Sequence, residues 1–295
     1  MLSRRAFIAQ LTAFGGIGVA RGRASAASSI DPFLVNEYPS QPIGYKNAAG
    51  KVQVTSVISA PSTTKTVIVG GQSNMATACG TATYTTVSSS ANNLSIYDGG
   101  IYAGSDPVLG ASYAPATGLS SVPMRIADRA IAQGKATRAI MVPVAIGGTP
   151  YAAWVPTASN TLFTRVSTAI LRCRARGLEP DVFVWGQGET DNGLGTSAAS
   201  VTASIQAIVG AIRAAPISCT APFYVGLYTM VSGSSSATIR TGISNSVSAP
   251  LNIVLGYDAD TNCTVAGGFR LADQTHLSNT GLTLSGNGWA DLVFP

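Results

Sequence analysis

The chain has 295 residues, of which 46% are hydrophobic and only 11% are charged, and this balance excludes a disordered chain, a collagen and a coiled coil. Its formal net charge is +5, but four arginines precede the first carboxylate, at Asp31. The remainder is therefore nearly neutral and has no general field that would attract nucleic acid or an anionic membrane surface.

The first 26 residues are predicted to be an export signal. Arg4 and Arg5 form a twin-arginine pattern, a moderately apolar stretch covers 6–20, and small residues lead up to a cleavage site after Ala26. A first helix of the fold is the alternative, but three glycines in or beside the apolar stretch weaken it. After cleavage we expect a domain of residues 27–295 in the periplasm or outside a bacterial cell. Membrane insertion is not expected, because no later apolar run reaches the roughly 18 residues that span a bilayer.

Beyond residue 50, short apolar runs alternate with amphipathic stretches. Strands are predicted at 52–58, 66–69, 137–145, 181–185, 223–228 and 252–255. Helices are predicted at 122–132, 161–176, 197–214 and 280–292. Helical crossovers between consecutive strands predict one α/β domain, in which helices cover both faces of a parallel sheet. The polar stretch 77–117 is interpreted as a long insertion after the second strand.

The cysteines permit either disulfides or buried thiols. An even number allows three pairings in an oxidising compartment, but Cys173 falls on an apolar stripe that suits a free thiol equally well. The four are Cys79, Cys173, Cys219 and Cys263. Since the sequence has one histidine and no C-x-x-C pair, we expect neither a metal site nor a cofactor.

A candidate nucleophile follows the second predicted strand. Ser73 stands in a turn just after Gly70 and Gly71, where a serine can be exposed in front of the amides that begin a helix. The segment is not a G-x-S-x-G elbow, because Met75 takes the place of the last glycine. An ordinary turn capped by Ser73 is the alternative.

The histidine lies just before the last predicted helix. His276 follows Asp273 by three residues, a spacing at which the carboxylate can bind one imidazole nitrogen while the other faces a cleft. Such a carboxylate fixes the tautomer and stabilises the imidazolium. A surface histidine beside a loop aspartate is the alternative, but it does not explain why His276 falls at the same end of the predicted sheet as Ser73.

Two further strand ends offer hydrogen-bond donors. Gly147 and Gly148 follow the strand predicted at 137–145 and can present backbone N–H groups to an oxyanion. Gln187 stands between two glycines after the strand predicted at 181–185. Plain turns are the alternative for each pair of glycines.

Together these segments resemble the SGNH (GDSL-like) hydrolases, and within them the sialate O-acetylesterases and acetylxylan esterases. That branch shows G-Q-S-N-M, G-G-T/S followed closely by Trp, Q-G-E-x-D and D-x-x-H. This sequence has all four in that order, at 71–75, 147–154, 187–191 and 273–276. The resemblance implies a single-domain, three-layer α/β/α structure with a flavodoxin-like parallel sheet, the SGNH hydrolase fold.

The resemblance also implies roles for individual residues. Ser73 is the expected nucleophile, His276 the general base and Asp273 its orienting acid. The amides of Ser73 and Gly148, with the side chain of Gln187, are expected to form the oxyanion hole. Supporting or substrate-binding roles are expected for Gln72, Asn74, Glu189 and Trp154.

The leading hypothesis is an exported serine esterase that removes short acyl groups, acetyl above all, from carbohydrate hydroxyls through an acyl-enzyme. Some relatives take the acid of the triad from the Q-G-E block, which makes Glu189 the alternative to Asp273. A polysaccharide O-acyltransferase with the same triad is an alternative function, and a non-catalytic glycan-binding module is a second, which the presence of all three triad residues disfavours. The expected partner is an acylated oligo- or polysaccharide and not nucleic acid. No feature of the sequence indicates an oligomeric state.

Overall fold

The computed structural model describes residues 44–55, 63–157 and 162–295. The predicted export signal lies outside these residues, and so does the second half of the strand predicted at 52–58. No helix in the described ranges is long and apolar enough to cross a membrane.

A seven-stranded sheet forms the centre of the molecule, in the order β3-β2-β4-β1-β5-β6-β7. Neighbouring strands are parallel except for β2 and β3. The strands are β1 (Thr64–Gly71), β2 (Ala91–Leu94), β3 (Ile101–Ala103), β4 (Arg138–Pro143), β5 (Val182–Gly188), β6 (Phe223–Tyr228) and β7 (Ile253–Asp258). Without β2 and β3, the strands follow the order 2-1-3-4-5 by position in the chain, which is the flavodoxin order. The prediction of an α/β fold with a parallel sheet is therefore confirmed.

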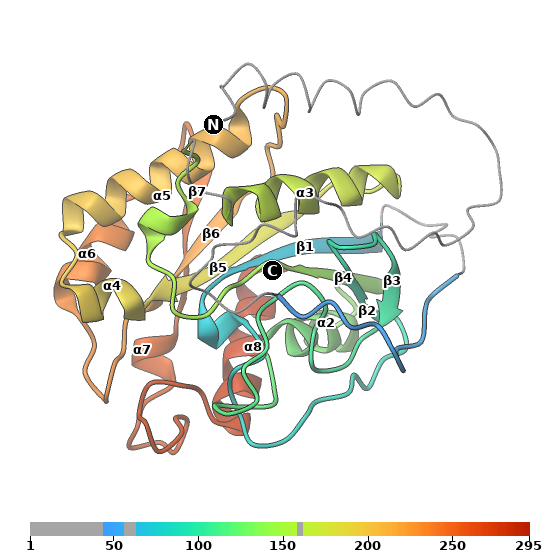
Figure 1. Ribbon diagram of the computed structural model, residues 1–295, viewed down its shortest axis with the longest axis horizontal. Coiled ribbons are helices and arrows are strands. Elements are labelled where there is room, and N and C mark those ends of the chain that lie inside the picture. The colour runs from blue at the N-terminus through green and yellow to red at the C-terminus, as the bar shows by residue number, and fades with distance from the viewer. Residues whose placement is uncertain (1–43, 56–62, 158–161) are drawn as a thin grey trace.

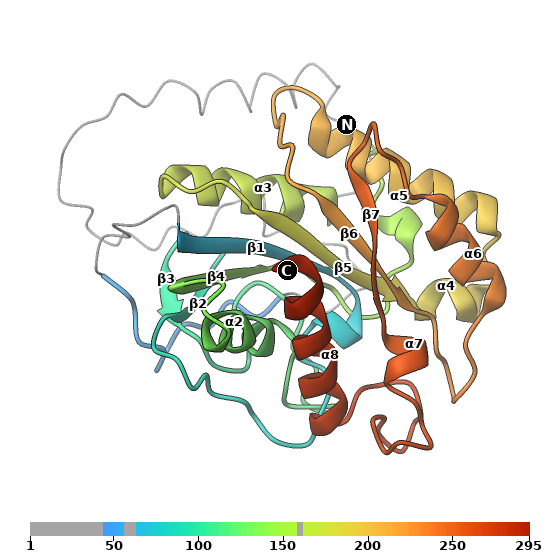
Figure 2. The same ribbon diagram turned by 180° about the vertical axis from the view of Figure 1, so that it is seen from behind.

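Helices cover both faces of this sheet (Figures 1 and 2). On one face lie α3, α5 and α6, and on the other lie α2 and α8. The helices are α2 (Pro123–Ala132), α3 (Leu162–Ala175), α4 (Glu189–Leu194), α5 (Ala198–Arg213), α6 (Ala237–Asn245), α7 (Ala259–Asn262) and α8 (Asn279–Val293), with 3-10 turns η4 (Ser73–Met75) and η5 (Tyr151–Trp154). The result is the predicted three-layer arrangement.

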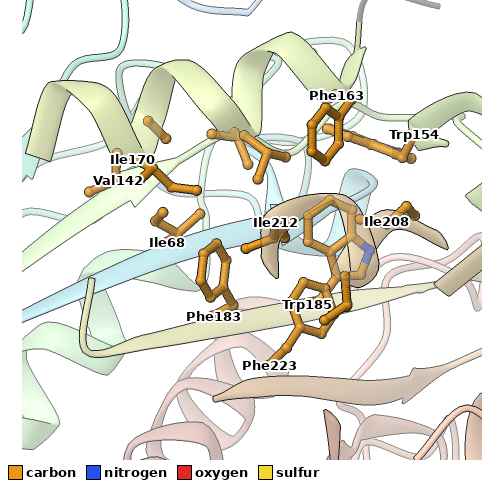
Figure 3. Packing of buried hydrophobic residues seen from close by; sticks show 14 of the residues in the cluster. Ile68, Val142, Trp154, Phe163, Ile170, Phe183, Trp185, Ile208, Ile212 and Phe223 are labelled. Carbon is orange, nitrogen blue, oxygen red and sulfur yellow. The ribbon is translucent and has the colours of Figure 1, made fainter. Parts of the chain in front are cut away.

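Side chains of the central strand β1 point alternately into two hydrophobic cores. Ile68 packs with α3 and α5 (Figure 3), whereas Val67 and Val69 join the core under α2 and α8. On the first side, Phe183 of β5 stacks on Phe223 of β6 with ring centroids 5.6 Å apart. Because dense packing holds the strands from both faces, the loops at their carboxyl ends start from fixed positions.

The stretch 77–117 is more than the insertion that its polar composition suggested, because it contains β2 and β3. Asn93 of β2 is almost completely buried. Its side chain donates to the carbonyls of Leu109 (3.1 Å) and Met141 (3.4 Å) and accepts the Leu109 N–H (2.6 Å). These bonds satisfy a polar side chain inside the sheet, where the sequence pattern would demand an apolar one.

Two other predictions differ locally from the structure. In the described half of the strand predicted at 52–58, Gln53 makes a single bridge to Tyr102. Helix α6 was not predicted, since it follows a run of serines that is typical of a loop. Ser236 is in fact the N-cap of this helix, and its hydroxyl accepts the Ile239 N–H.

All four cysteines are buried and free. The disulfide pairings that their number allowed are therefore not formed, and Cys173 is the buried thiol of the alternative interpretation. Burial raises the pKa of each thiol. A raised pKa lowers the population of the reactive thiolate, so these groups act as small core side chains.

Candidate active site

The predicted site residues meet at the carboxyl ends of the parallel strands. Ser73 follows β1, Gly147 follows β4, and Gln187 is the last residue but one of β5. Asp273 and His276 lie on the loop between α7 and α8. The helical turn after β1, cyan in Figure 1, lies at this end of the sheet. The next two strands of the parallel sheet along the chain after β1, apart from β2, are β4 and β5, and they pair with opposite edges of β1. The end of β1 therefore opens into the crevice where ligands bind in such sheets.

The approach of β1 to β5 requires glycine just ahead of the nucleophile. Gly71 has a φ of +117°, and a Cβ there would clash with the carbonyl group of Gly186. The chain then turns into η4, whose first residue is Ser73. Met75, at the end of this turn, is completely buried and anchors it, whereas Ser73 keeps 8% of its surface exposed.

Ser73, His276 and Asp273 form one chain of hydrogen bonds. The Ser73 Oγ lies 3.0 Å from His276 Nε2, and His276 Nδ1 lies 2.6 Å from Asp273 Oδ2. The second carboxylate oxygen, Asp273 Oδ1, accepts the backbone N–H groups of Thr275 and His276, both at 2.9 Å. The carboxylate is therefore fixed to the loop that carries the imidazole.

The charge of Asp273 determines the tautomer of the imidazole. Burial alone would raise the pKa of this carboxyl, but hydrogen bonds from the side chain and backbone of His276 and the backbone of Thr275 hold the pKa below its ordinary value. An ionised carboxylate only accepts, so the proton lies on Nδ1. The Nε2 of the neutral ring is then free to accept the Ser73 hydroxyl proton.

The backbone N–H groups of Ser73 and of Gly148 are available as hydrogen-bond donors at the nucleophile. A Cβ on Gly147 would lie 3.6 Å from the Ser73 Cβ, so this loop is against the nucleophile. The Gly147 N–H itself donates to Ser112 Oγ (2.9 Å). The next residue, Gly148, is exposed with a φ of +71°. Among the residues that the structure describes, no acceptor takes the N–H of Ser73 or of Gly148.

The Gln187 side chain is hydrogen-bonded to the loop that carries Gly147 and Gly148. It is completely buried, donates through Nε2 to the Thr149 carbonyl (2.7 Å) and accepts through Oε1 from the Trp185 indole (3.0 Å). The donation to an oxyanion that was predicted for Gln187 therefore has only the second Nε2 hydrogen to use.

Of the other site candidates, Trp154 and Gln72 have supporting contacts. Trp154 is completely buried, donates to Thr149 Oγ1 (3.0 Å) and packs edge-on against Trp185. Trp154 therefore has supporting contacts, one of the two roles expected for it, and no exposed surface to offer a substrate. The Gln72 Oε1 accepts the Thr190 N–H (3.1 Å) and so joins the nucleophile turn to α4.

The alternative acid, Glu189, contacts Asn74 and not the imidazole. Its Oε1 accepts from Asn74 Nδ2 at 2.6 Å. Burial raises the pKa of Glu189 to about 8, and the bond from Asn74 only partly offsets this. Asn74 Nδ2 also donates to the Thr275 carbonyl (3.1 Å), while Asn74 Oδ1 accepts the Leu277 N–H (2.9 Å).

Arg270, which belongs to none of the four motifs, holds the histidine loop. Its guanidinium donates to the carbonyls of Thr275 (2.6 Å) and Cys263 (2.8 Å). One signal was present, because Arg270 is the only lysine or arginine after Arg240. Ser112, which accepts the Gly147 N–H, was not predicted either, because it lies in a polar stretch with many serines and no motif distinguishes it.

Comparison with known proteins identifies the family of the chain and structures that share its fold. The model of a family described as carbohydrate esterase, sialic acid-specific acetylesterase, matches residues 63–294, whereas no curated protein matches. A solved structure of a protein from Arabidopsis thaliana is similar, with a TM-score of 0.60 and 20% identity over 78% of this chain and 97% of that one. A carbohydrate acetylesterase from Xanthomonas citri has a TM-score of 0.52 and 17% identity over 77% of this chain, which spans 54% of that enzyme. These two structures share the fold. The family match covers most of the chain, which therefore belongs to the carbohydrate esterase family of sialic acid-specific acetylesterases.

Proposed function

We propose that the protein is an exported serine esterase that removes short acyl groups, acetyl above all, from carbohydrate hydroxyls through an acyl-enzyme. The observation that carries the proposal is the unbroken chain of hydrogen bonds from Ser73 Oγ through His276 to Asp273. Membership of the family supports an esterase that acts on acetylated carbohydrate. Export rests on the twin-arginine pattern of the first 26 residues.

In the first half of the reaction, Ser73 Oγ attacks the ester carbonyl while its proton passes to His276 Nε2. The carbonyl oxygen becomes an oxyanion, which the N–H groups of Ser73 and Gly148 can bind. Asp273 stabilises the imidazolium. His276 then donates this proton to the sugar oxygen, the bond between the acyl carbon and the sugar oxygen breaks, and Ser73 is left acylated.

In the second half, water replaces the sugar. His276 removes a proton from the water as its oxygen attacks the acyl carbon, and the second tetrahedral intermediate forms in the same oxyanion site. Its collapse breaks the bond to Ser73 Oγ, which regains its proton from His276. The product leaves as acetic acid, which releases its proton to water to give acetate, and the enzyme returns to its starting state.

The test is acetate release by the mature chain from acetylated xylan, acetylated cello-oligosaccharides and O-acetylated sialic acid. We expect activity on at least one of them, and we expect Ser73→Ala to lose it by about 10⁴-fold or more, since the covalent step is removed. Thermal unfolding of the variant should match that of the wild type. Wild-type rates in a folded Ser73→Ala variant would disprove the nucleophile. Mass spectrometry of the exported protein should give a chain that begins at Ala27.

A further inference from the structure

We propose that Asn74 is a positioning residue for the reaction proposed above: its side-chain amide holds the nucleophile turn in register with the loop that carries Asp273 and His276. The inference rests on the proposed function. It deepens it by assigning the contact that aligns two segments lying 203 residues apart in the chain.

Every hydrogen-bonding position of the Asn74 amide is used. Asn74 is completely buried. Its two Nδ2 hydrogens go to Glu189 Oε1 (2.6 Å) and to the Thr275 carbonyl (3.1 Å). Its Oδ1 accepts the Leu277 N–H (2.9 Å) and the Cys79 thiol (3.2 Å). An amide has two donors and two lone pairs, so this one is saturated.

Two of these four contacts bracket the general base. Thr275 and Leu277 are the residues on either side of His276, and Asn74 is the residue directly after Ser73. One side chain thus fixes the backbone of the base relative to the backbone of the nucleophile. Because a misplacement of about 1 Å can cost about 10²-fold in rate, this contact supports the 3.0 Å distance between Ser73 Oγ and His276 Nε2.

Thr275, Leu277 and Glu189 together set the direction in which the amide points. If the amide turned over, Asn74 Oδ1 would face the Thr275 carbonyl and Nδ2 would face the Leu277 N–H, and an ionised Glu189 would add a further acceptor beside Oδ1. The other carboxyl oxygen, Glu189 Oε2, is buried and has no hydrogen-bond partner within the described residues. The charged and titratable groups that interact electrostatically with this carboxyl are Asp260, Arg270, Tyr151 and Cys79, from the elements around it.

Substitution of Asn74 by aspartate tests the proposal with little change of shape. Asn74→Asp keeps an acceptor for Leu277 but presents a second oxygen, in place of Nδ2, to Glu189 and Thr275. We expect kcat to fall by about 10²-fold at pH 8 while KM changes little, since alignment and not substrate binding is lost. The ratio of variant to wild-type kcat should fall further above pH 8, where the proton that the two carboxyls can share is lost.

The single histidine provides a readout that does not depend on activity. Its imidazole gives one set of NMR signals, and we expect those signals to shift or broaden in Asn74→Asp. The matched control is Asn93→Asp, which alters an equally buried asparagine in β2, away from the site. It should leave the imidazole signals and the kcat of the folded enzyme unchanged.

A double variant tests the direction of the bond. With Asn74→Asp, Glu189→Gln supplies an amide that can donate to the new carboxylate, in place of the bond that Asn74 donated to Glu189. We therefore expect part of the lost kcat to return at pH 8 and the pH dependence of the ratio to disappear.

A folded Asn74→Asp variant with kcat within about twofold of wild type and unchanged imidazole signals would overturn the proposal. Should Asn74→Asp not fold, Asn74→Ala removes every hydrogen bond of the amide and is measured in its place. If Ser73→Ala remains active, the proposed function fails, while the imidazole signals still report on positioning.

Discussion

The Asp273 carboxylate accepts three hydrogen bonds from a single loop, one from the imidazole and two from backbone N–H groups. Asp273→Asn should keep the shape but favour the wrong imidazole tautomer, with a loss of up to about 10⁴-fold in kcat. Glu189→Gln should cost much less, because Glu189 contacts Asn74 and not the base. Both variants are compared under one set of conditions after their folding is checked. A larger loss of kcat in Glu189→Gln would place the acid of the triad in the Q-G-E block.

The buried Glu189 should also make stability depend on pH. In the unfolded chain its carboxyl ionises near the ordinary pKa of 4.5, but burial raises the pKa of the folded chain to about 8. Between these values the folded state binds more protons, so the free energy of unfolding falls as pH rises, by up to about 1.4 kcal/mol per pH unit. The stabilisation is complete below pH 4.5 and is lost by about pH 8.

Urea unfolding of the wild type and of Glu189→Gln isolates this effect, because the variant has no proton to lose at this position. The difference in free energy of unfolding, wild type minus variant, should decrease from pH 5 to pH 8. A difference that stays constant over this range would show that Glu189 ionises in the folded protein at its ordinary pKa.

At the scale of elements, the contact between β1 and β5 depends on Gly71. Two glycines with positive φ make a matched pair: Gly71, where a Cβ would clash with Gly186, and Gly134, where nothing lies within 4 Å. Gly134→Ala should cost about 1–2 kcal/mol of stability from backbone strain alone. Gly71→Ala should cost more than about 3 kcal/mol, because strands must separate as well. Chemical unfolding of the two variants makes the comparison, and equal costs would mean that the strands tolerate a Cβ at this contact.

The elements that the sequence predicts well are those with a single dominant pattern. The apolar strands β4, β5 and β6 and the helices α2, α3, α5 and α8 lie within a few residues of their predicted ranges. Strand β2 was missed because Asn93 is inside the sheet, where side-chain hydrogen bonds to distant backbone replace apolar contacts. Such bonds exist only after the chain has folded, so local composition does not reveal them.

The same distinction holds for the site. Ser73, Asp273 and His276 are recognisable because each belongs to a short motif whose residue types suit the chemistry. The roles of Asn74 and Glu189 could not be assigned from their motifs, since their partners lie 115 and 201 residues away in the chain. For Trp154 the motif left a supporting and a substrate-binding role open, because a motif gives the position of a residue along the chain and not its burial.

At the scale of the whole molecule, the sheet order brings the ends of β1, β4 and β5 and the loop before α8 to one edge. Three of these four segments begin at strands fixed between two cores. The loop before α8 does not, and it depends on side chains such as Asn74 and Arg270 for its position. The precision of the site is thus a property of the folded whole and not of the histidine loop alone.

The reactivity of the four cysteines should also depend on the folded core as a whole. All four are buried and free, and burial raises the pKa of each thiol. A thiol-specific chromogenic disulfide should therefore find almost no reactive thiol in the native protein. In denaturant without reductant it should find four.

Cys79→Ala supplies the control, because it should lower the count in denaturant to three. In the native protein, the slow labelling rate should follow the population of opened molecules and rise with urea, since each thiol becomes reactive only when the core around it opens. Cys79 contacts the Ser73 carbonyl and the Asn74 side chain, so its labelling should inactivate the enzyme, and inactivation should proceed at the labelling rate of this one residue. Two thiols in place of four in denaturant would reveal a disulfide. Fast labelling of Cys79 in an enzyme that keeps full activity would contradict the prediction, because it would show that the core around Cys79 opens without disturbing the active site.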